Sequence, residues 1–338
     1  MKKPLAFIVT PAPAGSRLGN RVTANRWAGI LRGLGWRVKV AQTWEGQPAD
    51  LLIALHARKS HSSVARWAAQ CPGRPLLVAL TGTDLYQDLP NNPQALESLA
   101  LAGRLVALNR LAERRLPAEN RPKLRVILQS AQPGPAGSLT HSSEFHRSAL
   151  PGSPADSFDV LVVGHLRPEK DPFRAALAAR LLPAASRIRV WQLGRAIAPG
   201  MAQAARTEET ANPRYVWLGT YPHREILRRM AQADLLVLSS RMEGGANVLS
   251  EAAVVGLPVL ASAVEGNLGL LGEDYPGLFP LEDTQALAGL LERAEGDPAF
   301  LGALRAAMAR LAPQVTPQAE REGWRSLLAE WLSMGKGV

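Results

Sequence analysis

The chain has 338 residues, of which 46% are hydrophobic and 20% charged, with a net charge of +10 and one cysteine, Cys71. This composition is typical of an ordered globular protein, and the length predicts two domains. The single cysteine excludes an intrachain disulfide, and no apolar run approaches the roughly 20 residues of a membrane span, so we expect a cytoplasmic protein that does not enter a membrane.

Residues 1–130 alternate short apolar runs with helical patterns and predict a first Rossmann-like domain. Strands are predicted at 5–10, 37–41, 51–55, 76–80, 105–107 and 126–128, and helices near 20–34, 60–70, 94–101 and 109–116. Unbroken apolar strands that alternate with helices indicate a parallel sheet covered on both faces. We interpret the first run as a buried strand rather than a secretory signal, because it is short for such a signal.

Basic side chains follow two of these strands. Arg17, Arg21 and Asn25 recur every four positions after the first strand, and where the stretch is helical they share one face near the positive helix end. A second cluster follows the third strand and contains His56, Arg58, Lys59 and His61. Neither segment contains an acidic residue, so both favour anion binding over the alternative of a solvated charged surface.

The basic charge raises the possibility of nucleic-acid binding. The arginines are scattered through alanine-rich helices, however, and no basic run is interleaved with aromatic residues as in a single-strand binding surface. We therefore expect small anionic substrates rather than nucleic acid. The sequence does not indicate an oligomeric state.

Residues 131–157 are rich in Pro, Gly and Ser and predict an interdomain linker with one short helix, 139–149. A second domain is predicted at 158–312, with strands at 158–163, 188–193, 215–217, 234–238, 258–261 and 278–279. Helices are predicted at 172–182, 199–210, 223–232, 247–256, 284–294 and 298–311. The last segment, 313–338, includes an amphipathic helix at 317–334 that we expect to pack back on the first domain.

Two carboxylates eight positions apart, Glu243 and Glu251, bracket a Gly-Gly turn between a predicted strand and a predicted helix. Such a turn offers the backbone N–H groups of Gly244, Gly245 and Ala246 at the positive end of a helix, which favours a phosphate. The carboxylates can accept hydrogen bonds from neutral hydroxyls beside that phosphate. The alternative is that both glutamates belong to a solvated helix face.

This segment resembles the Glu-x7-Glu motif of retaining GT-B glycosyltransferases of the family 4 type. The resemblance implies an α/β fold of two doubly wound Rossmann-like domains that face each other across a cleft. It also implies a UDP-sugar as donor substrate, no metal and no other cofactor. Glu243 would contact the hydroxyls of the transferred sugar, and Glu251 would hold the ribose diol.

Residues 162–172 look like the Gly-Arg-Leu-x-x-x-Lys loop of that family. Gly164 would let the diphosphate approach, and Lys170 matches the phosphate-binding lysine. His165 occupies the position at which the family has its arginine, so either His165 itself or Arg167 would stabilise the leaving diphosphate.

Trp217 and Leu218 resemble the stretch whose backbone reads the nucleotide base in this family, although Trp217 could equally be a core residue. The donor-binding residues that the resemblance implies are Gly164, His165, Arg167, Lys170, Trp217, Leu218, Glu243, Gly244, Gly245, Ala246, Asn247 and Glu251.

Four segments together, 10–24, 54–60, 80–86 and 164–172, are similar to the selenosugar synthase family of selenoneine biosynthesis. That family couples selenophosphate to a UDP-sugar, which forms a carbon–selenium bond and releases UDP and then phosphate. The acceptor-binding residues that result are Gly15, Ser16, Arg17, Asn20, Arg21, His56, Lys59, Thr81, Gly82 and Thr83. The catalytic residues that result are Glu243, Lys170, Arg167, Thr83 and Asp84.

Related transferases often carry a His-Asp pair in the loop that follows the strand 76–80. Here that loop has Thr81, Thr83 and Asp84 but no histidine. A hydroxyl nucleophile needs a general base, so the loop favours a nucleophile that is already an anion. Two alternatives stay open: a family 4 hexosyltransferase that acts on a hydroxyl acceptor, and a nucleotide-sugar-binding protein without catalytic activity.

Overall fold

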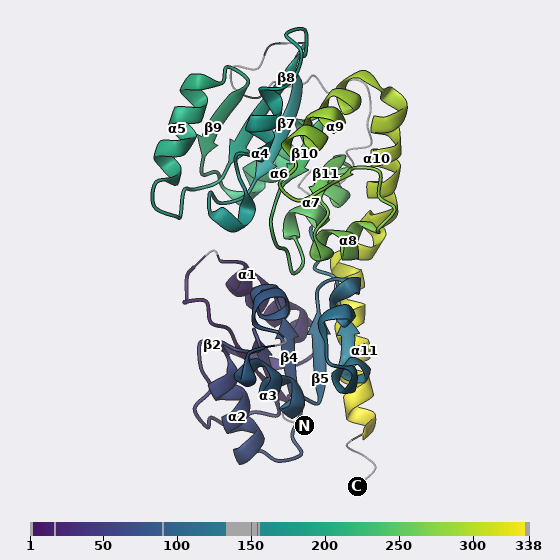
Figure 1. Cartoon of the computed structure of the whole chain (residues 1–338). Helices are drawn as coiled ribbons and strands as arrows, with labels where there is room; N and C mark the ends of the chain where they lie inside the picture. Colours follow the sequence, from purple (N-terminus) through teal and green to yellow (C-terminus); the bar gives the residue numbers. More distant parts are fainter. Residues whose placement is uncertain are drawn as a thin grey trace. The chain divides into compact units, whose positions relative to one another are not determined.

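The computed structural model describes residues 3–16, 18–89, 91–132, 150, 154 and 156–334. The chain divides into two compact units (Figure 1). The first unit combines Met1–Gln129 with Pro317–Val338, and the second is Ser130–Thr316. The predicted linker helix, 139–149, lies outside the described residues.

The first unit contains a six-stranded sheet in the order β2-β1-β3-β4-β5-β6, in which every neighbouring pair is parallel. Its strands are β1 (Leu5–Val9), β2 (Arg37–Ala41), β3 (Leu51–Leu55), β4 (Leu76–Leu80), β5 (Arg104–Ala107) and β6 (Leu124–Val126). Its α-helices are α1 (Gly19–Gly33), α2 (His61–Gln70), α3 (Pro93–Leu101) and α11 (Pro317–Met334).

Successive strand residues of this sheet enter two different cores, because side chains alternate between the two faces of a strand. Phe7 lies in a core with Trp67 of α2 and further residues of α3. The next residue, Ile8, lies in a core with Trp27 of α1 and Trp324 of α11. Both faces of the sheet are therefore covered by helices, which explains why its central strands are apolar throughout.

Helix α11 is attached to the first unit by buried polar contacts as well as by packing. The rings of Trp27 and Trp324 meet edge to face with centroids 4.8 Å apart. Glu320, which is 1% exposed, accepts a hydrogen bond of 2.8 Å from Trp27 Nε1 and pairs with Arg26 Nε at 3.1 Å. A buried carboxylate held by two donors fixes the position of the helix along α1.

The second unit contains a six-stranded parallel sheet in the order β12-β11-β10-β7-β8-β9. Its strands are β7 (Phe158–Val163), β8 (Ile188–Leu193), β9 (Tyr215–Gly219), β10 (Leu235–Leu238), β11 (Val259–Ser262) and β12 (Leu278–Phe279). Its α-helices are α4 (Arg174–Ala179), α5 (Met201–Ala211), α6 (His223–Gln232), α7 (Asn247–Val255), α8 (Glu265–Leu271), α9 (Thr284–Gly296) and α10 (Pro298–Leu311).

The strand order of each sheet reverses at one place, and doubly wound sheets bind their ligands beyond the carboxyl ends of the strands at that place. In the first sheet the reversal lies between β1 and β3, and in the second it lies between β7 and β10. The segments that begin at Thr10, His56, Gly164 and Ser239 follow these four strands. They contain most of the residues that the sequence singles out.

The prediction of two doubly wound parallel sheets is confirmed. Three local predictions were wrong. The strand predicted at 126–128 is Leu124–Val126, and the helix predicted at 109–116 is a 3-10 helix, Arg110–Arg115, which begins where the Asn109 side chain accepts from the backbone N–H of Leu111. Helix α8 was missed, because the glycines of its sequence, EGNLGLL, indicate a turn.

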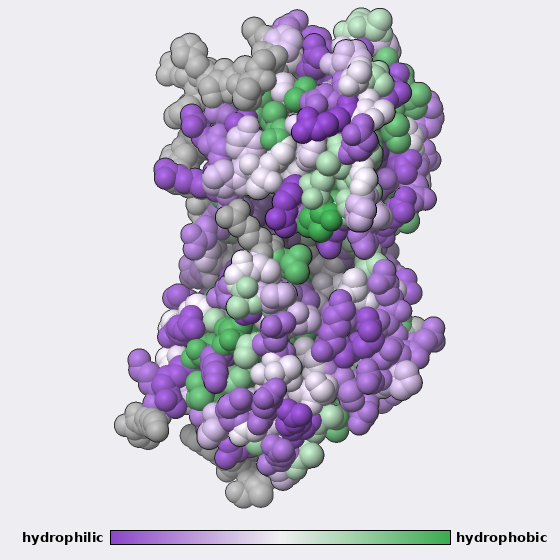
Figure 2. All heavy atoms as spheres, turned by 90° about the vertical axis from the view of Figure 1, so that its left-hand side faces the viewer, coloured by the Kyte–Doolittle hydropathy of each residue, from purple (hydrophilic) through white to green (hydrophobic). Residues whose placement is uncertain are grey.

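No α-helix among the described residues is both long and apolar enough to cross a membrane. Figure 2 shows hydrophilic side chains spread over one face of the molecule, with apolar residues in small separate patches.

Candidate active site

The loop after β7 begins with a close contact between two backbones. Gly164 donates its N–H to the carbonyl of Leu193 at 2.9 Å. Gly194, which follows β8, has a φ of +150°, and a Cβ atom there would lie 1.9 Å from the carbonyl oxygen of Gly164. Only glycine fits at this position, so the ends of β7 and β8 are held close together.

The loops after β7 and β10 are joined by further hydrogen bonds. Ser239 Oγ donates to the carbonyl of Asp171 at 2.8 Å, and the N–H of Arg241 donates to the carbonyl of Glu169 at 2.9 Å. Between these contacts the Lys170 ammonium forms an ion pair with the Glu243 carboxylate. The side chains are 22% and 9% exposed, so a mostly buried carboxylate is paired with a cation at the reversal of the strand order.

Glu243 is also held from the side of α8. A Cβ atom on Gly266 would lie 1.7 Å from the carbonyl oxygen of Glu243. The first turn of α8 therefore packs directly against the backbone that carries this carboxylate. The sequence offers no signal for this contact, which depends on the helix that was not predicted.

Glu251 lies on α7, which begins at Asn247 after the Gly-Gly turn. Its Oε1 atom accepts a hydrogen bond of 2.8 Å from Nε2 of His223, the first residue of α6. This hydrogen bond raises the pKa of His223, against the opposing effect of partial burial. His223 was not predicted from the sequence, because it lies 28 positions before Glu251 and outside the motif.

The two residues proposed as the second phosphate-binding cation differ in their surroundings. His165 Nδ1 accepts a hydrogen bond of 3.3 Å from the backbone N–H of Arg195. An imidazole that accepts through Nδ1 carries its proton on Nε2 and can donate from there. The Arg167 guanidinium lies 4.0 Å from the Glu169 carboxylate, and both side chains are about half exposed.

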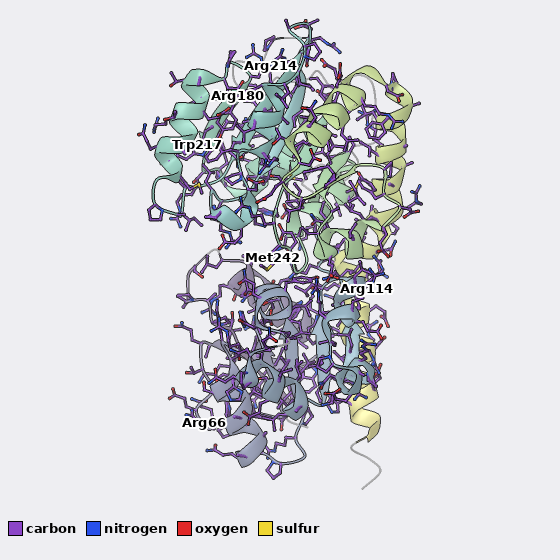
Figure 3. The ribbon with its side chains drawn as sticks, viewed as in Figure 1. Arg66, Arg114, Arg180, Arg214, Trp217 and Met242 are labelled. Atoms are coloured by element: carbon purple, nitrogen blue, oxygen red, sulfur yellow. The ribbon has the colours of Figure 1, made fainter. Side chains whose placement is uncertain are left out.

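Trp217 lies on β9 (Figure 3) and is half-buried. Its indole N–H donates to the carbonyl of Gly194 at 2.9 Å, and the guanidinium of Arg206 lies 5.7 Å from its ring centroid. Its backbone N–H donates to the Glu209 carboxylate at 3.0 Å. Its ring is thus attached to the end of β8, next to the Gly164 loop.

In the first unit, the loop after β1 is closed by Arg21. This arginine is 5% exposed, and its Nε atom donates to the carbonyl of Pro13 at 3.0 Å. Gly15 has a φ of +76° in the turn that precedes Ser16. Helix α1 begins only at Gly19, so Asn20 lies in its first turn, and Arg17 lies outside the described residues. Of the three residues predicted to share a face, Arg21 and Asn25 both lie on α1, four positions apart.

The loop 81–84 contains no histidine of its own, but a histidine from the neighbouring strand end contacts it. His56, which follows β3, places its Nε2 atom 2.9 Å from Thr83 Oγ1. His56 is 1% exposed and has a φ of +76°, and burial lowers its pKa. Its Nδ1 atom accepts the backbone N–H of Lys59 at 3.3 Å. The neutral ring therefore carries its proton on Nε2 and donates to Thr83, which turns the hydroxyl proton of Thr83 away from it.

Asp84 holds two strand ends together. It is fully buried, and its Oδ1 atom accepts the backbone N–H groups of Thr81 and Gly82, both at 2.9 Å. Its Oδ2 atom accepts the N–H of Ala57 at 3.0 Å. Asp84 thus fixes the loop after β4 against the segment after β3, and begins a π-helical turn, Asp84–Asp88, of a kind often found at functional sites.

The second basic cluster has acidic partners, contrary to the sequence-based expectation. Arg58 Nε lies 2.8 Å from the Asp88 carboxylate, and His61 Nε2 lies 3.4 Å from that of Glu97. These acids come from the segments after β4, which the local sequence around His56 does not show. Lys59 is exposed, and its charge acts on His56.

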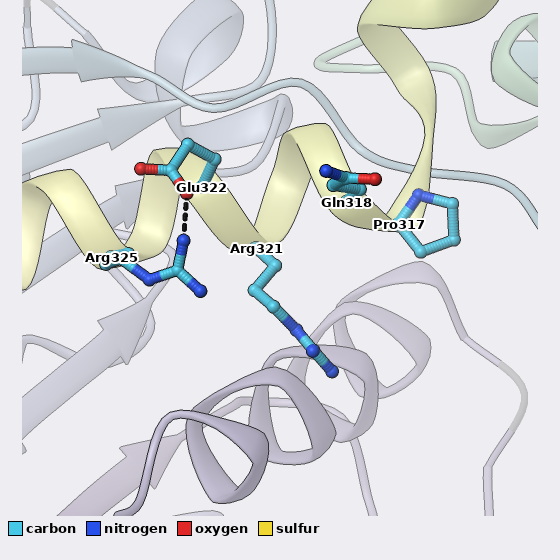
Figure 4. Close-up of a pocket in the computed structure, with 5 residues that line it drawn as sticks. All are labelled: Pro317, Gln318, Arg321, Glu322 and Arg325. Atoms are coloured by element: carbon cyan, nitrogen blue, oxygen red, sulfur yellow. Dashed lines mark hydrogen bonds and ion pairs between the residues drawn. The ribbon is translucent and has the colours of Figure 1, made fainter.

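The described residues contain no group of three or more His, Cys, Asp or Glu side chains that could hold a metal ion. A pocket in the first unit is lined by Pro317, Gln318, Arg321, Glu322 and Arg325 of α11 (Figure 4). Arg321 points toward α1, and Arg325 pairs with Glu322. This pocket contains none of the predicted site residues.

The sequence model of glycosyl transferases group 1 matches residues 146–315, just over half of the chain. No curated protein matches the chain. Several solved structures share its fold. HepE from Anabaena in complex with UDP is 17% identical, with a TM-score of 0.75 over 97% of this chain and 100% of that chain.

The HepE complex with UDP-glucose is also 17% identical, with a TM-score of 0.72 over 96% of this chain and 99% of that chain. Sucrose-phosphate synthase from Thermosynechococcus elongatus is 18% identical, with a TM-score of 0.75 over 98% of this chain and 100% of that chain. The similarity therefore extends over both units.

Proposed function

The chain belongs to the group 1 family of glycosyl transferases and has the GT-B fold, and from this premise we propose that it transfers a hexosyl group from a UDP-sugar to selenophosphate. The observation that carries the transferase function is the Lys170–Glu243 ion pair at the strand reversal of the second unit. This pair lies within the segment that matches the family. Its charges suit a donor with both an anionic diphosphate and neutral sugar hydroxyls.

In the proposed reaction, selenium attacks the anomeric carbon of the sugar. The bond from that carbon to the diphosphate oxygen breaks, and UDP leaves with the electron pair. Lys170, together with His165 or Arg167, stabilises the negative charge that develops on the departing diphosphate. Water then cleaves the selenium–phosphorus bond of the product and releases phosphate.

The carboxylates orient the donor in this proposal. Glu243 accepts hydrogen bonds from hydroxyls of the transferred sugar, and Glu251 accepts them from the ribose diol. The fixed backbone beneath Glu243, which Gly266 contacts, reduces the reorganisation that binding requires. UDP as the nucleotide is favoured by the HepE structures, whose ligands are UDP and UDP-glucose.

The acceptor would bind in the first unit near Thr83. Because the His56 Nε2–H donates a hydrogen bond to Thr83 Oγ1, the hydroxyl hydrogen of Thr83 is left to donate a hydrogen bond to an anion. His56 in this tautomer offers no basic nitrogen toward Thr83. The arrangement suits a nucleophile that has already lost its proton, such as selenophosphate, and Lys59 supplies a nearby positive charge.

The position of His56 also favours a second candidate, a hexosyltransferase that acts on a hydroxyl acceptor. If the ring turned so that an unprotonated nitrogen faced the acceptor, His56 could act as a general base. The deciding experiment incubates the protein with a mixture of UDP-sugars and either selenophosphate, phosphate or a panel of alcohols. UDP release is measured, and products are identified by mass spectrometry.

We expect UDP release that depends on selenophosphate, together with a product that contains selenium. Release with an alcohol and not with selenophosphate would establish the second candidate. If no acceptor raised UDP release above the level without protein, the chain would be a nucleotide-sugar-binding protein or would use a donor outside the mixture.

A further inference from the structure

We propose that His223 is a positioning residue for the donor: it holds the Glu251 carboxylate in the orientation that receives the ribose hydroxyls. The inference rests on the proposed donor site and adds a residue from outside the motif. It requires no knowledge of the acceptor, because both residues belong to the second unit.

The geometry singles out this pair. His223 is the first residue of α6, and Glu251 lies in the middle of α7, which packs against α6. The hydrogen bond from Nε2 to Oε1 is 2.8 Å long. The Glu251 side chain is 15% exposed and the His223 side chain 67% exposed, so the histidine approaches a mostly buried carboxylate from the solvent side.

A glutamate side chain has several rotatable bonds, and a ligand that must fix them loses affinity. The hydrogen bond from His223 fixes one carboxylate oxygen before the ligand arrives. A carboxylate has two oxygens that accept hydrogen bonds, so Oε2 remains to accept from the ribose. The pair therefore prepares Glu251 for a neutral diol.

A purely structural role predicts something different. An ion pair with one partner this exposed contributes little to stability, so its loss should change neither Tm nor ligand binding. A positioning role predicts that ligand affinity falls while Tm stays the same. It further predicts that the loss depends on the ribose hydroxyls, because His223 acts only through Glu251.

The test measures the Kd of UDP and of 2′,3′-dideoxy-UDP by isothermal titration calorimetry for the wild type, His223→Ala and His223→Gln. We expect His223→Ala to weaken UDP binding by about threefold to tenfold, as for the loss of one hydrogen bond of ordinary net strength, because His223 acts on the ligand only through Glu251. Gln offers an N–H donor at a similar reach and should restore most of the affinity. For the dideoxy analogue, wild type and His223→Ala should bind alike.

The control is Arg228→Gln, which removes a positive charge from an exposed position on the same helix. It should leave the Kd of UDP within about twofold, because exposed charges are screened by salt. Failure of the wild type to bind UDP would overturn the proposed donor site itself. The positioning role is wrong if wild type and His223→Ala bind UDP equally well. It is also wrong if the substitution weakens binding of the dideoxy analogue as much as it weakens binding of UDP.

Discussion

Lys170 and Glu243 lie 73 positions apart in the chain and form an ion pair between the loops that follow β7 and β10. Neither loop could place its charged residue alone. The side-chain hydrogen bond from Ser239 and the backbone hydrogen bond from Arg241 fix the two loops against each other. The pair is thus a product of the parallel order in which β7 and β10 are neighbours.

Replacing Lys170 or Glu243 by Ala should lower kcat/KM for glycosyl transfer by about 100-fold or more, because each is proposed to contact the donor during bond breaking. Arg241→Gln is the matched control, since it breaks the exposed ion pair of Arg241 with Glu282 close by. That variant should keep kcat/KM within about twofold. Wild-type turnover by both Lys170→Ala and Glu243→Ala would contradict the donor-site assignment.

Gly266→Ala should destabilise the protein by about 1–3 kcal/mol or more, because the new methyl group has no room beside the Glu243 carbonyl. It should also reduce activity, since the clash can be removed only if the backbone of Glu243 or of Gly266 shifts. Gly289→Ala serves as the control on α9, where a Cβ atom meets nothing within 4 Å. The control should leave stability unchanged or raise it by up to about 1 kcal/mol. Denaturant unfolding of both variants measures the difference, and equal effects would refute the close contact.

Stability should depend on pH through His56. Burial lowers its pKa below the ordinary value of 6.5, and Lys59 and Arg58 act in the same direction, whereas Asp84 and Asp88 oppose it. The unfolded chain therefore takes up the proton at a higher pH than the folded protein does. The stabilisation is complete above about pH 6.5 and is lost as the pH falls below that value.

His56→Asn tests this linkage, because Asn does not titrate and tolerates the positive φ of the position. The variant will be less stable than the wild type at about pH 8, and the gap should narrow as the pH falls toward about 5. Thermal unfolding over this range provides the comparison. Parallel curves for the two proteins would mean that His56 keeps an ordinary pKa.

Transfer should proceed without a metal ion, since Lys170 and a second cation from the same loop are proposed to neutralise the leaving diphosphate. Excess EDTA should therefore leave the rate of UDP release within about twofold of the untreated rate. Added Mg²⁺ serves as the control and should not raise it by more than that. If EDTA lowered the rate of UDP release strongly and Mg²⁺ restored it, a metal ion rather than Lys170 would be the main source of positive charge at the diphosphate.

The sequence predicts the sheets well because unbroken apolar strands such as 51–55 and 76–80 have few other interpretations. It predicts less well what depends on contacts between strands. His56 and Thr83 are 27 positions apart, and their contact follows only from the parallel pairing of β3 with β4. For the same reason, the sequence does not predict that Asp88 and Glu97 pair with Arg58 and His61 of the basic cluster.

Helix α8 illustrates another limit. Gly266 and Gly269 indicate a break in a helical pattern, and local propensity alone predicts a turn there. The structure instead uses Gly266 because the backbone of Glu243 leaves no space for a larger residue. Tertiary contact overrides propensity at this position, and it does so beneath a residue of the candidate site.

Helix α11 makes the first unit discontinuous along the chain, because Trp324 and Leu327 complete a core that begins at residue 6. During synthesis on the ribosome, the nascent sheet β1–β6 has one face covered by α1 alone until the whole second unit has been made. A ribosome stalled anywhere before residue 317 would present an incompletely covered apolar surface to chaperones, and the maturation of this unit therefore depends on when α11 emerges.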